Sequence, residues 1–238
     1  MDNEVLMKID LYNDGIGAVE LVDHMGTDLT IVNSARVSFG KHKEELDEKD
    51  EKLINYLVKH KHTSTFEHNV ATFRFKVPLF VRSQHHRHRT WSYNEISRRY
   101  TDFNIEFYEP EQFRTQHESN RQASNNELIN PPMFFERAPN WRLTASATIK
   151  KHHEISLSVF EKLLEEGVCR EQARGVLPQN MYTEYYGTAN LSNIMKFIGL
   201  RTHEGAQWEI QQVANAMLEI IEELWPVAVS SYRENIAQ

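Results

Sequence analysis

The chain has 238 residues, of which 40% are hydrophobic, and its formal net charge is -7. This length and apolar content suit a globular protein with a sizeable core. No apolar stretch approaches the roughly 20 residues that cross a bilayer, and acidic residues stand where a signal peptide carries basic ones. We therefore expect a soluble, cytoplasmic protein without a membrane partner. The single cysteine, Cys169, excludes an internal disulfide and any zinc site made of several thiolates.

The first half of the chain contains one clear strand. Short apolar runs interrupted by turn residues over 19–39 indicate pieces of helix or strand. The charged run 41–52 is interpreted as a solvated loop that enters an amphipathic helix. Apolar and polar residues then alternate from Ala71 to Leu79, which predicts a strand with one buried face.

The second half is mainly helical after a polar interruption. Residues 109–139 begin with a stretch rich in Asn, Gln, Ser and charge, so we expect a surface excursion within a domain. Apolar positions from Leu143 to Leu164 outline a long helix that Gly167 ends. A short helix should follow from about 170 to 176, and the last long helix is expected at roughly 205–224.

A dense cationic segment occupies residues 82–99, where five arginines and three histidines accompany a single carboxylate, Glu95. Such crowding costs repulsion unless an anion or a carboxylate from elsewhere in the fold neutralises it. Three interpretations are open: a solvated surface, a nucleic-acid patch, or a pocket for a phosphate-bearing ligand. The scarcity of lysine and the interleaved Ser92, Asn94 and Ser97 favour a shaped pocket over binding to a nucleic-acid polymer.

The histidines of this region also suggest a metal site. His85, His86 and His88 are close in sequence, and three more histidines precede the strand. However, neighbouring arginines disfavour a cation, and no zinc-ligand spacing such as HExxH is present. We expect no metal. The GxGxxG turn that commonly binds a dinucleotide is absent as well.

The run from Arg87 to Tyr100 reads RHRTWSYNEISRRY. It resembles the RHRxxSxNExSxRY signature of the flavin-dependent thymidylate synthases, the ThyX family. The resemblance extends to VELVDHMGTDL, SARVSFG, HTSTFEH, ARGVLPQNMYTEYYGTAN and AQWEIQQ. It implies an α+β fold of the ThyX type, with an antiparallel sheet flanked by long helices, and a single catalytic domain over residues 1–238.

The resemblance also implies a reaction. In this family dUMP is methylated to dTMP, methylenetetrahydrofolate supplies the carbon, and NADPH reduces the cofactor FAD. It implies a homotetramer whose active sites lie at subunit interfaces, so that folate, dUMP and FAD meet residues of several subunits.

Individual residues follow from matching positions. The resemblance implies that dUMP is bound by Gln84, His85, His86, Arg87, Glu95, Ile96, Ser97, Arg98, Arg99, Arg174 and Arg201. It implies that FAD is bound by Ser64, Arg87, His88, Arg89, Glu95, Asn190, Leu191, Ser192 and Lys196. Arg201 would be the catalytic residue, because its charge stabilises negative charge that develops on the uracil ring.

Two positions depart from the family pattern. Lys196 stands where asparagine is frequent, and THEGAQ replaces the common ending HAQ, so that His203 comes two residues before the usual histidine position. The flavin contacts of this region are therefore open.

Cys169 is not expected to act as a nucleophile. It lies outside the signature, and a lone cysteine is usually an inert, buried residue. Ser97 is a possible alternative nucleophile, but a serine needs a nearby base, so phosphate binding is favoured. We expect the uracil ring to be activated by electrostatics and the flavin.

Overall fold

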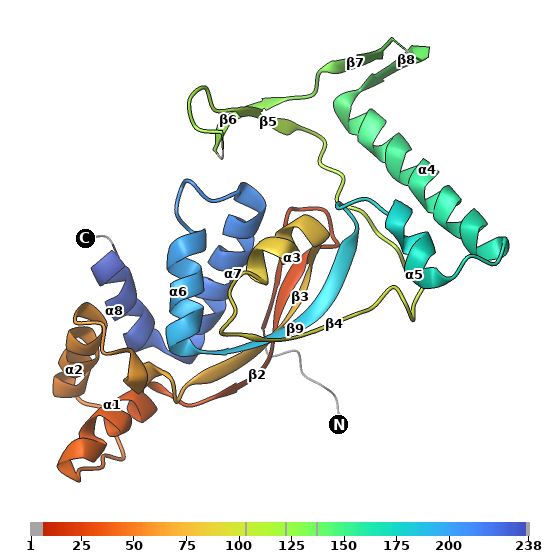
Figure 1. Ribbon diagram of the computed structural model, residues 1–238. Coiled ribbons are helices and arrows are strands. Elements are labelled where there is room, and N and C mark those ends of the chain that lie inside the picture. Colours follow the sequence, from red (N-terminus) through yellow and green to blue (C-terminus); the bar gives the residue numbers. More distant parts are fainter. Residues whose placement is uncertain (1–6, 103, 122, 137, 237–238) are drawn as a thin grey trace. The chain divides into compact units, whose positions relative to one another are not determined.

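The computed structural model of the chain describes residues 7–102, 104–121, 123–136 and 138–236 (Figure 1). The chain forms two compact units. The first comprises Met1–Lys76, Gln84–Asn94 and Tyr185–Gln238, and the second comprises Val77–Ser83 and Glu95–Glu184. The expectation of one catalytic domain over residues 1–238 stays a prediction.

A five-stranded sheet forms the centre of the first unit, and three of its strands continue into segments of the second. Its strand order is β1 (Met7–Asp10), β2 (Ala18–Met25), β3 (Val70–Pro78), β9 (Tyr182–Asn190) and β4 (Ser92–Glu95). The pairs β1–β2 and β2–β3 are antiparallel. The predicted strand is confirmed as β3, because Ala71, Phe73 and Phe75 are all completely buried and the polar residues between them are not.

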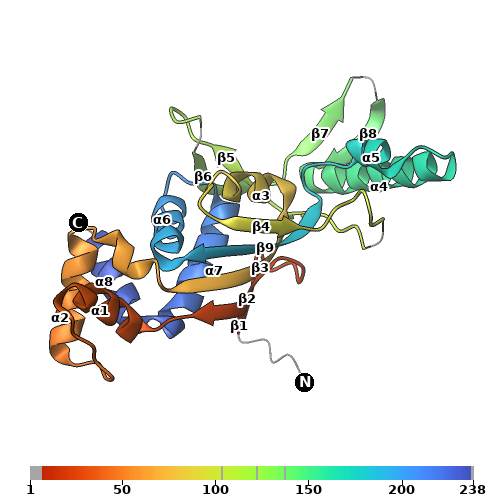
Figure 2. The same ribbon diagram turned by 60° about the horizontal axis from the view of Figure 1, so that its bottom comes forward.

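Helices pack on this sheet and beside it. They are α1 (Asp28–Arg36), the 3-10 turns η1 (Val37–Phe39) and η2 (Thr63–Phe66), α2 (Glu48–Lys59), α6 (Leu191–Arg201), α7 (Trp208–Leu224) and α8 (Pro226–Ile236). Helices α6 and α7 lie side by side, and α7 packs against β2 (Figure 2). Helix α2 packs on α8. Together, α6 and α7 bury a continuous apolar stripe that includes Ile194, Phe197, Ile210, Met217 and Ile220.

The last predicted helix is confirmed as α7, but a further helix follows it. Pro226 does not only stop α7; it opens α8, a position where its fixed φ and missing N–H cost nothing. The carboxylate of Asp28 accepts hydrogen bonds from the backbone N–H groups of Val227 and Ala228, both at 3.0 Å. A residue about 200 positions away thus satisfies the first turn of α8, which no local pattern could have predicted.

The charged run 41–52 is not simply a solvated loop, so that interpretation was wrong in one respect. Asp50 in α2 is completely buried. Its carboxylate pairs with the guanidinium of Arg36 at the end of α1 and with the ammonium group of Lys43. Asn33 adds two hydrogen bonds to the backbone of Lys43. A buried carboxylate therefore ties the loop between α1 and α2 to both helices.

The second unit is built around a long helix. Its elements are most of α3 (Leu79–His85), β5 (Phe113–Gln116), β6 (Ser124–Ile129), β7 (Pro132–Phe135), β8 (Ala138–Thr144), α4 (Ala145–Glu165), α5 (Arg170–Ala173) and the 3-10 turn η3 (Arg174–Val176). The predicted long helix is confirmed as α4: Thr144 caps its first turn, and Gly167 adopts a φ of 85° just beyond its end. The short predicted helix is confirmed as α5 and η3.

Two antiparallel hairpins, β5–β6 and β7–β8, occupy most of the polar stretch 109–139. Most described residues there are exposed, as expected for a surface excursion. Strands were not predicted because polar side chains hold the first hairpin in place of an apolar face. The Gln116 amide donates to the carbonyl oxygens of Asn120 and Ala123, and Asn125 donates to the Gln116 carbonyl. In the described part of the chain no helix is long and apolar enough to cross a membrane.

The Asp50 cluster gives a test of the fold. Burial alone would raise the pKa of Asp50, but hydrogen bonds from Lys43 and Arg36 outweigh it and lower the pKa. Asp50→Ala leaves two cations without their shared carboxylate, so we expect the free energy of unfolding to fall by about 3 kcal/mol. Urea denaturation at pH 7 measures it, with the exposed Glu44→Ala as control. Because the folded-state pKa is lowered, the difference between unmodified and Asp50→Ala protein should shrink as the pH falls below about 4; a difference that is constant with pH would contradict this account.

Candidate functional site

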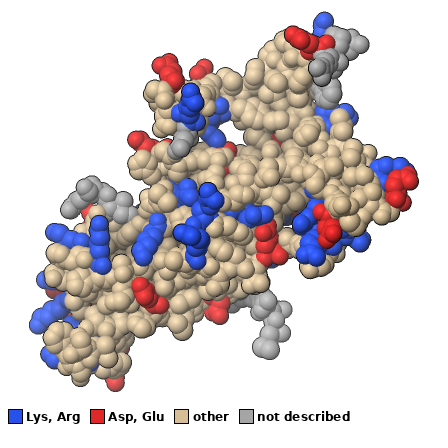
Figure 3. All heavy atoms as spheres, in the orientation of Figure 1, with Lys and Arg blue, Asp and Glu red and all other residues tan. Residues whose placement is uncertain are grey.

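The predicted site residues fall in both compact units. The first unit holds Ser64, Gln84, His85, His86, Arg87, His88, Arg89, Asn190, Leu191, Ser192, Lys196 and Arg201, and the second holds Glu95, Ile96, Ser97, Arg98, Arg99 and Arg174. Basic side chains gather over the part of the first unit where Figure 1 draws α6 (Figure 3).

In the first unit, the end of α6 meets the turn that follows α3. Arg201 Nε donates to His88 Nε2 at 3.2 Å, and Arg201 Nη2 donates to the Gln84 carbonyl at 3.4 Å. Arginine has no acceptor, so the His88 ring accepts at Nε2 and carries its proton on Nδ1. Burial, and then the Arg201 charge, lower the pKa of His88. A neutral His88 thus orients the guanidinium of the predicted catalytic arginine.

His85 lies directly behind this contact. Its side chain is completely buried, and its ring packs edge-on against Phe75 and Trp91 and beside Phe197. Its Nδ1 lies 2.8 Å from the hydroxyl of Tyr185. Burial lowers the pKa of His85 well below its usual value, so the ring is neutral. The predicted contact of His85 with dUMP stays a prediction, and this position favours an indirect role through His88.

The two arginines on either side of His88 are exposed to solvent. Arg87 and Arg89 are exposed, and no hydrogen bond or ion pair joins their guanidinium groups to any described residue. Tyr93 fixes the turn that carries them, because its hydroxyl donates to the carbonyl oxygens of His85 and His88 at 3.0 Å each. Unpaired arginines on a fixed turn are suited to bind phosphate groups.

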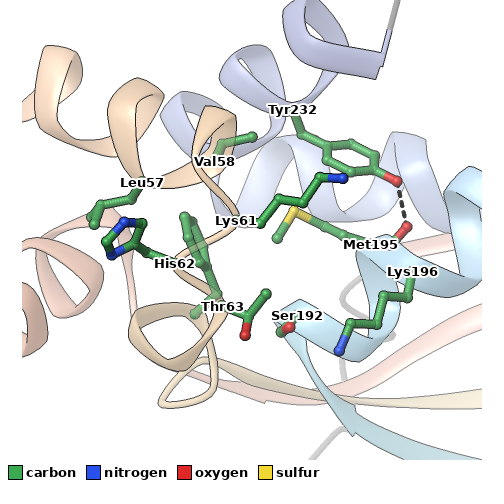
Figure 4. A pocket seen from close by; sticks show the side chains of 10 residues that line it. Leu57, Val58, Lys61, His62, Thr63, Ser192, Met195, Lys196 and Tyr232 are labelled. Atoms are coloured by element: carbon green, nitrogen blue, oxygen red, sulfur yellow. Dashed lines mark hydrogen bonds between the residues drawn. The ribbon is translucent and has the colours of Figure 1, made fainter.

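A second feature of the first unit is a cavity of about 330 Å³ at the start of α6 (Figure 4). It is lined by Leu57, Val58, Lys61, His62, Thr63, Phe66, Ser192, Met195, Lys196 and Tyr232. The Ser192 hydroxyl is buried in this wall and has no hydrogen-bond partner among the described residues. Lys61 and Lys196 add two exposed ammonium groups. An apolar wall with an unsatisfied hydroxyl and two cations fits part of a flat, phosphate-bearing cofactor.

The other residues predicted to bind FAD here have structural tasks. Asn190 caps α6, because its side-chain oxygen accepts from the Asn193 N–H at 3.0 Å. The Leu191 side chain is completely buried, and its N–H donates to the Asn69 carbonyl. Ser64 lies in η2 and is exposed. Lys61, His62, Thr63 and Tyr232 were not predicted; HTSTFEH was the only sequence signal near three of them.

His203, the residue that departs from the family pattern, shapes the turn before α7. Its Nδ1 accepts from the backbone N–H of Gly205 at 3.0 Å, and its side chain is exposed. Gln207 then accepts a hydrogen bond from the Gln84 amide, which links this turn to the end of α3.

The second unit contains a cavity of about 580 Å³. Of the residues predicted to bind dUMP, Glu95, Ile96, Ser97, Arg98 and Arg174 line it. The remaining lining residues are Leu79, Arg82, Glu171, Gly175, Leu177, Gln179, Met181 and Thr183. Arg99 does not line the cavity. Its side chain lies 3.9 Å from Glu171, which does line it. The second unit thus brings together residues from the signature and from ARGVLP, separated by about 75 positions in the chain.

Glu95 is held firmly in the wall of this cavity. Its Oε1 accepts from Arg82 Nε at 3.0 Å and from the Thr183 hydroxyl at 2.7 Å. The backbone N–H of the next residue, Ile96, donates to the Glu184 carbonyl. Arg82 belongs to the cationic segment but was not predicted to contact a ligand, and Thr183 was not indicated at all, because both become neighbours of Glu95 only through the fold.

Arg174 provides a free positive charge in the same cavity. It is exposed, and its guanidinium makes no hydrogen bond or ion pair with the described residues. The Ser97 hydroxyl accepts from the Arg99 N–H at 3.3 Å, which orders the turn of the signature. A cavity with an unpaired arginine, a hydroxyl and a fixed carboxylate suits a small ligand with an anionic and a hydrogen-bonding end. No group of three potential metal ligands occurs among the residues that the structure describes.

Comparisons with known proteins place these features in a family. The family model described as "Thymidylate synthase complementing protein" matches residues 20–227. A flavin-dependent thymidylate synthase of Thermus thermophilus is 44% identical over 222 residues, 93% of this chain and 77% of that protein. The enzyme of the same name from Thermotoga neapolitana is 41% identical over 223 residues, 92% and 91% of the two chains.

A solved structure agrees with this. The UMP/dUMP methylase PolB from Streptomyces cacaoi, bound with 5-Br dUMP, superposes with a TM-score of 0.79 at 32% identity and covers 95% of this chain and 97% of its own. Fold and site thus define an α+β enzyme with an antiparallel sheet, as predicted. The chain belongs to the family of the flavin-dependent thymidylate synthases, which confirms the resemblance and the enzyme class inferred from the signature.

The His88–Arg201 contact predicts a pH dependence. The folded-state pKa of His88 is lowered, so the unfolded chain binds more protons than the folded chain at acidic pH. The contact therefore contributes its full stability to the fold above about pH 6.5, and this stability is lost as the pH falls. His88→Gln keeps an acceptor but does not titrate. We expect the free energy of unfolding to fall more steeply between pH 7 and pH 5 in the unmodified protein than in His88→Gln, measured by urea denaturation. The exposed His42→Gln should follow the unmodified curve, and parallel curves for His88→Gln would refute the assignment.

Proposed function

We propose that this protein converts dUMP to dTMP by reductive methylation, with methylenetetrahydrofolate as carbon donor and NADPH as the reductant of FAD. The observation that carries this proposal is the cavity of the second unit, where Glu95, Ser97 and Arg174 come together. The names of the relatives support the reaction, and the dUMP analogue bound to PolB supports the substrate.

In this proposal the dUMP phosphate binds at the cationic end of that cavity. Arg174 is unpaired and can donate two parallel hydrogen bonds to phosphate oxygens. Ser97 adds a hydroxyl, and Arg99 is only weakly engaged with Glu171 across 3.9 Å. Glu95 has one oxygen fully used by Arg82 and Thr183, which leaves its second oxygen to accept from the ligand.

Arg201 acts on the uracil ring. Its guanidinium is oriented by His88 and by the Gln84 carbonyl, and burial lowers its pKa without removing the charge. A fixed cation beside the ring stabilises negative charge that develops there and makes the ring carbon a better nucleophile. No enzyme thiol is needed for this activation.

FAD binds to the first unit. Arg87 and Arg89 are free to hold its phosphates, and the cavity with Ser192 and Lys196 takes an apolar part of the molecule. The buried, unsatisfied Ser192 hydroxyl is the sign that a polar ligand atom is expected there. When bound, the flavin supplies the hydride for the reduction.

The working form is a homotetramer in which neighbouring subunits complete each site. Large apolar side chains are exposed on the second unit, at Leu128, Ile129, Phe134, Phe135, Ile155 and Val159. Such residues on β6, β7 and α4 are suited to burial against other subunits. The cytoplasm suits a chain whose only cysteine is free and exposed.

One experiment tests the proposal directly. The purified protein, reconstituted with FAD, should show a flavin absorbance band that NADPH bleaches faster when dUMP is present, and dTMP should form once methylenetetrahydrofolate is added. Arg174→Gln should raise KM for dUMP by about 30-fold, the value of one charge-assisted phosphate contact. Arg121→Gln, at the tip of the exposed hairpin, is the matched control. A protein that cannot bind FAD, or that oxidises NADPH without forming dTMP, would refute the proposal.

The salt dependence of ligand binding distinguishes a nucleic-acid-binding function from binding of a mononucleotide. Binding of one monophosphate should weaken only slightly between 50 and 200 mM salt, whereas binding of a polyanion should weaken by about 1,000-fold or more over that range.

The role of Cys169 gives a further prediction. The cysteine stands at the N-cap position of α5 and is exposed, so the expectation that it is buried was wrong. Its thiol lies 3.5 Å from Gln172, and it does not line the cavity of the second unit. Because no thiol bonds to the substrate in this mechanism, Cys169→Ala should keep kcat within about twofold. A loss of about 1,000-fold with FAD still bound would show that a thiol takes part.

A further inference from the structure

Arg98 differs from the other arginines of the signature. Its side chain is only 8% exposed, although it lies in the turn between β4 and the polar stretch and contributes to the cavity wall. A buried guanidinium is costly unless nearby groups neutralise it and accept its protons. What surrounds Arg98 therefore decides whether its charge is available to a substrate.

Protein groups surround this guanidinium. Nη2 donates to the carbonyl oxygen of Asn104 at 3.3 Å. Three carboxylates, Glu184, Glu106 and Asp102, act on it electrostatically. Burial lowers the pKa of Arg98 and these three carboxylates oppose that effect. Negative groups of the second unit thus act on Arg98, and one of them, Asp102, is also paired with Arg170.

These carboxylates belong to separate segments that are joined by backbone hydrogen bonds. The Glu184 carbonyl on β9 accepts from Ile96, at the start of the signature turn, and the Glu106 carbonyl accepts from Tyr182. Asp102 also receives two hydrogen bonds from Arg170 of α5. The Arg98 side chain lies where the signature turn, β9 and the segment around Glu106 converge.

Ser97, the residue before Arg98, lines the cavity, whereas Arg99, the residue after it, lies beside Glu171, which lines the cavity. The Arg99 side chain is half exposed. The Ser97 carbonyl accepts from the N–H groups of Tyr100 and Thr101, so the turn is a closed hydrogen-bonded unit. Holding the middle residue of this turn therefore sets the direction of both residues that flank it.

We propose that Arg98 is a positioning residue: its guanidinium is buried, donates to the Asn104 carbonyl, and holds the signature turn so that Ser97 and Arg99 can reach the monophosphate. This inference rests on the proposed function, and it replaces the direct contact between Arg98 and dUMP that the resemblance implies. The anion is held by Arg174, which has no partner among the described residues, together with Ser97 and Arg99.

A rescue experiment tests this role, because the two roles predict opposite results for a second substitution. Arg98→Gln removes the buried cation that acts on Glu184 and Glu106, while Asp102 keeps its ion pair with Arg170, and it should weaken dUMP binding by about 30-fold. Adding Glu106→Gln removes one of those carboxylate charges, so the double variant should bind dUMP within about threefold of the unmodified protein. If Arg98 held the phosphate itself, the double variant would bind as weakly as Arg98→Gln.

The measurement is calorimetric titration of FAD-loaded protein with dUMP, accompanied by the FAD content, kcat and KM of each variant. Glu106→Gln alone and Arg121→Gln are the controls, and both should bind dUMP within about threefold of the unmodified protein. If Arg98→Gln does not fold, the double variant decides alone: it should fold and bind dUMP.

The outcomes separate the two proposals. Unmodified protein that binds FAD but not dUMP would contradict the proposed function. Two results would overturn the positioning role and leave the proposed function intact, provided that the unmodified protein binds dUMP normally. One is a double variant that binds dUMP as weakly as Arg98→Gln, and the other is an Arg98→Gln variant that binds dUMP without loss.

Discussion

The arrangement of the site depends on how a crowded set of guanidinium groups is neutralised. The segment 82–99 carries five arginines and one carboxylate, and like charges at such density repel each other. The fold divides four of them into two classes, and the fifth, Arg99, lies 3.9 Å from Glu171. Arg82 and Arg98 are matched by carboxylates of the protein, whereas Arg87 and Arg89 have no partner among the described residues. The first class builds the walls, and the second remains available for anions.

This division explains the importance of Glu95, the single carboxylate of the segment. It accepts from Arg82 and Thr183 through one oxygen, and its backbone lies at the end of β4, where the sheet ends and the signature turn begins. Both its side chain and its backbone are therefore fixed in position. A carboxylate held in this way keeps its place when a ligand enters, which is the preorganisation that binding and catalysis require.

Helix α6 links the two functions proposed for the first unit. It is capped by Asn190, presents Ser192 and Lys196 near its start, and ends at Arg201. At 1.5 Å per residue its two ends lie roughly 16 Å apart, and its buried face, including Phe197, packs against the His85 ring. The cavity proposed for FAD and the arginine proposed to act in catalysis thus lie on one helix, and a shift of α6 would move both.

The sequence by itself determined the family, the strand β3 and the helices α4 and α7, because these depend on local periodicity and on a signature of closely spaced polar residues. Of the residues that line the second unit's cavity, the predicted site residues are Glu95, Ile96, Ser97, Arg98 and Arg174, and the other eight were not predicted. Helix α8, the buried Asp50 cluster and the polar hairpin could not be predicted from the sequence, because each depends on hydrogen bonds or ion pairs between segments rather than on apolar patterns. Which arginines are free was decided only by the tertiary structure, since a charge is neutralised by its neighbours in space and not by its neighbours in the chain.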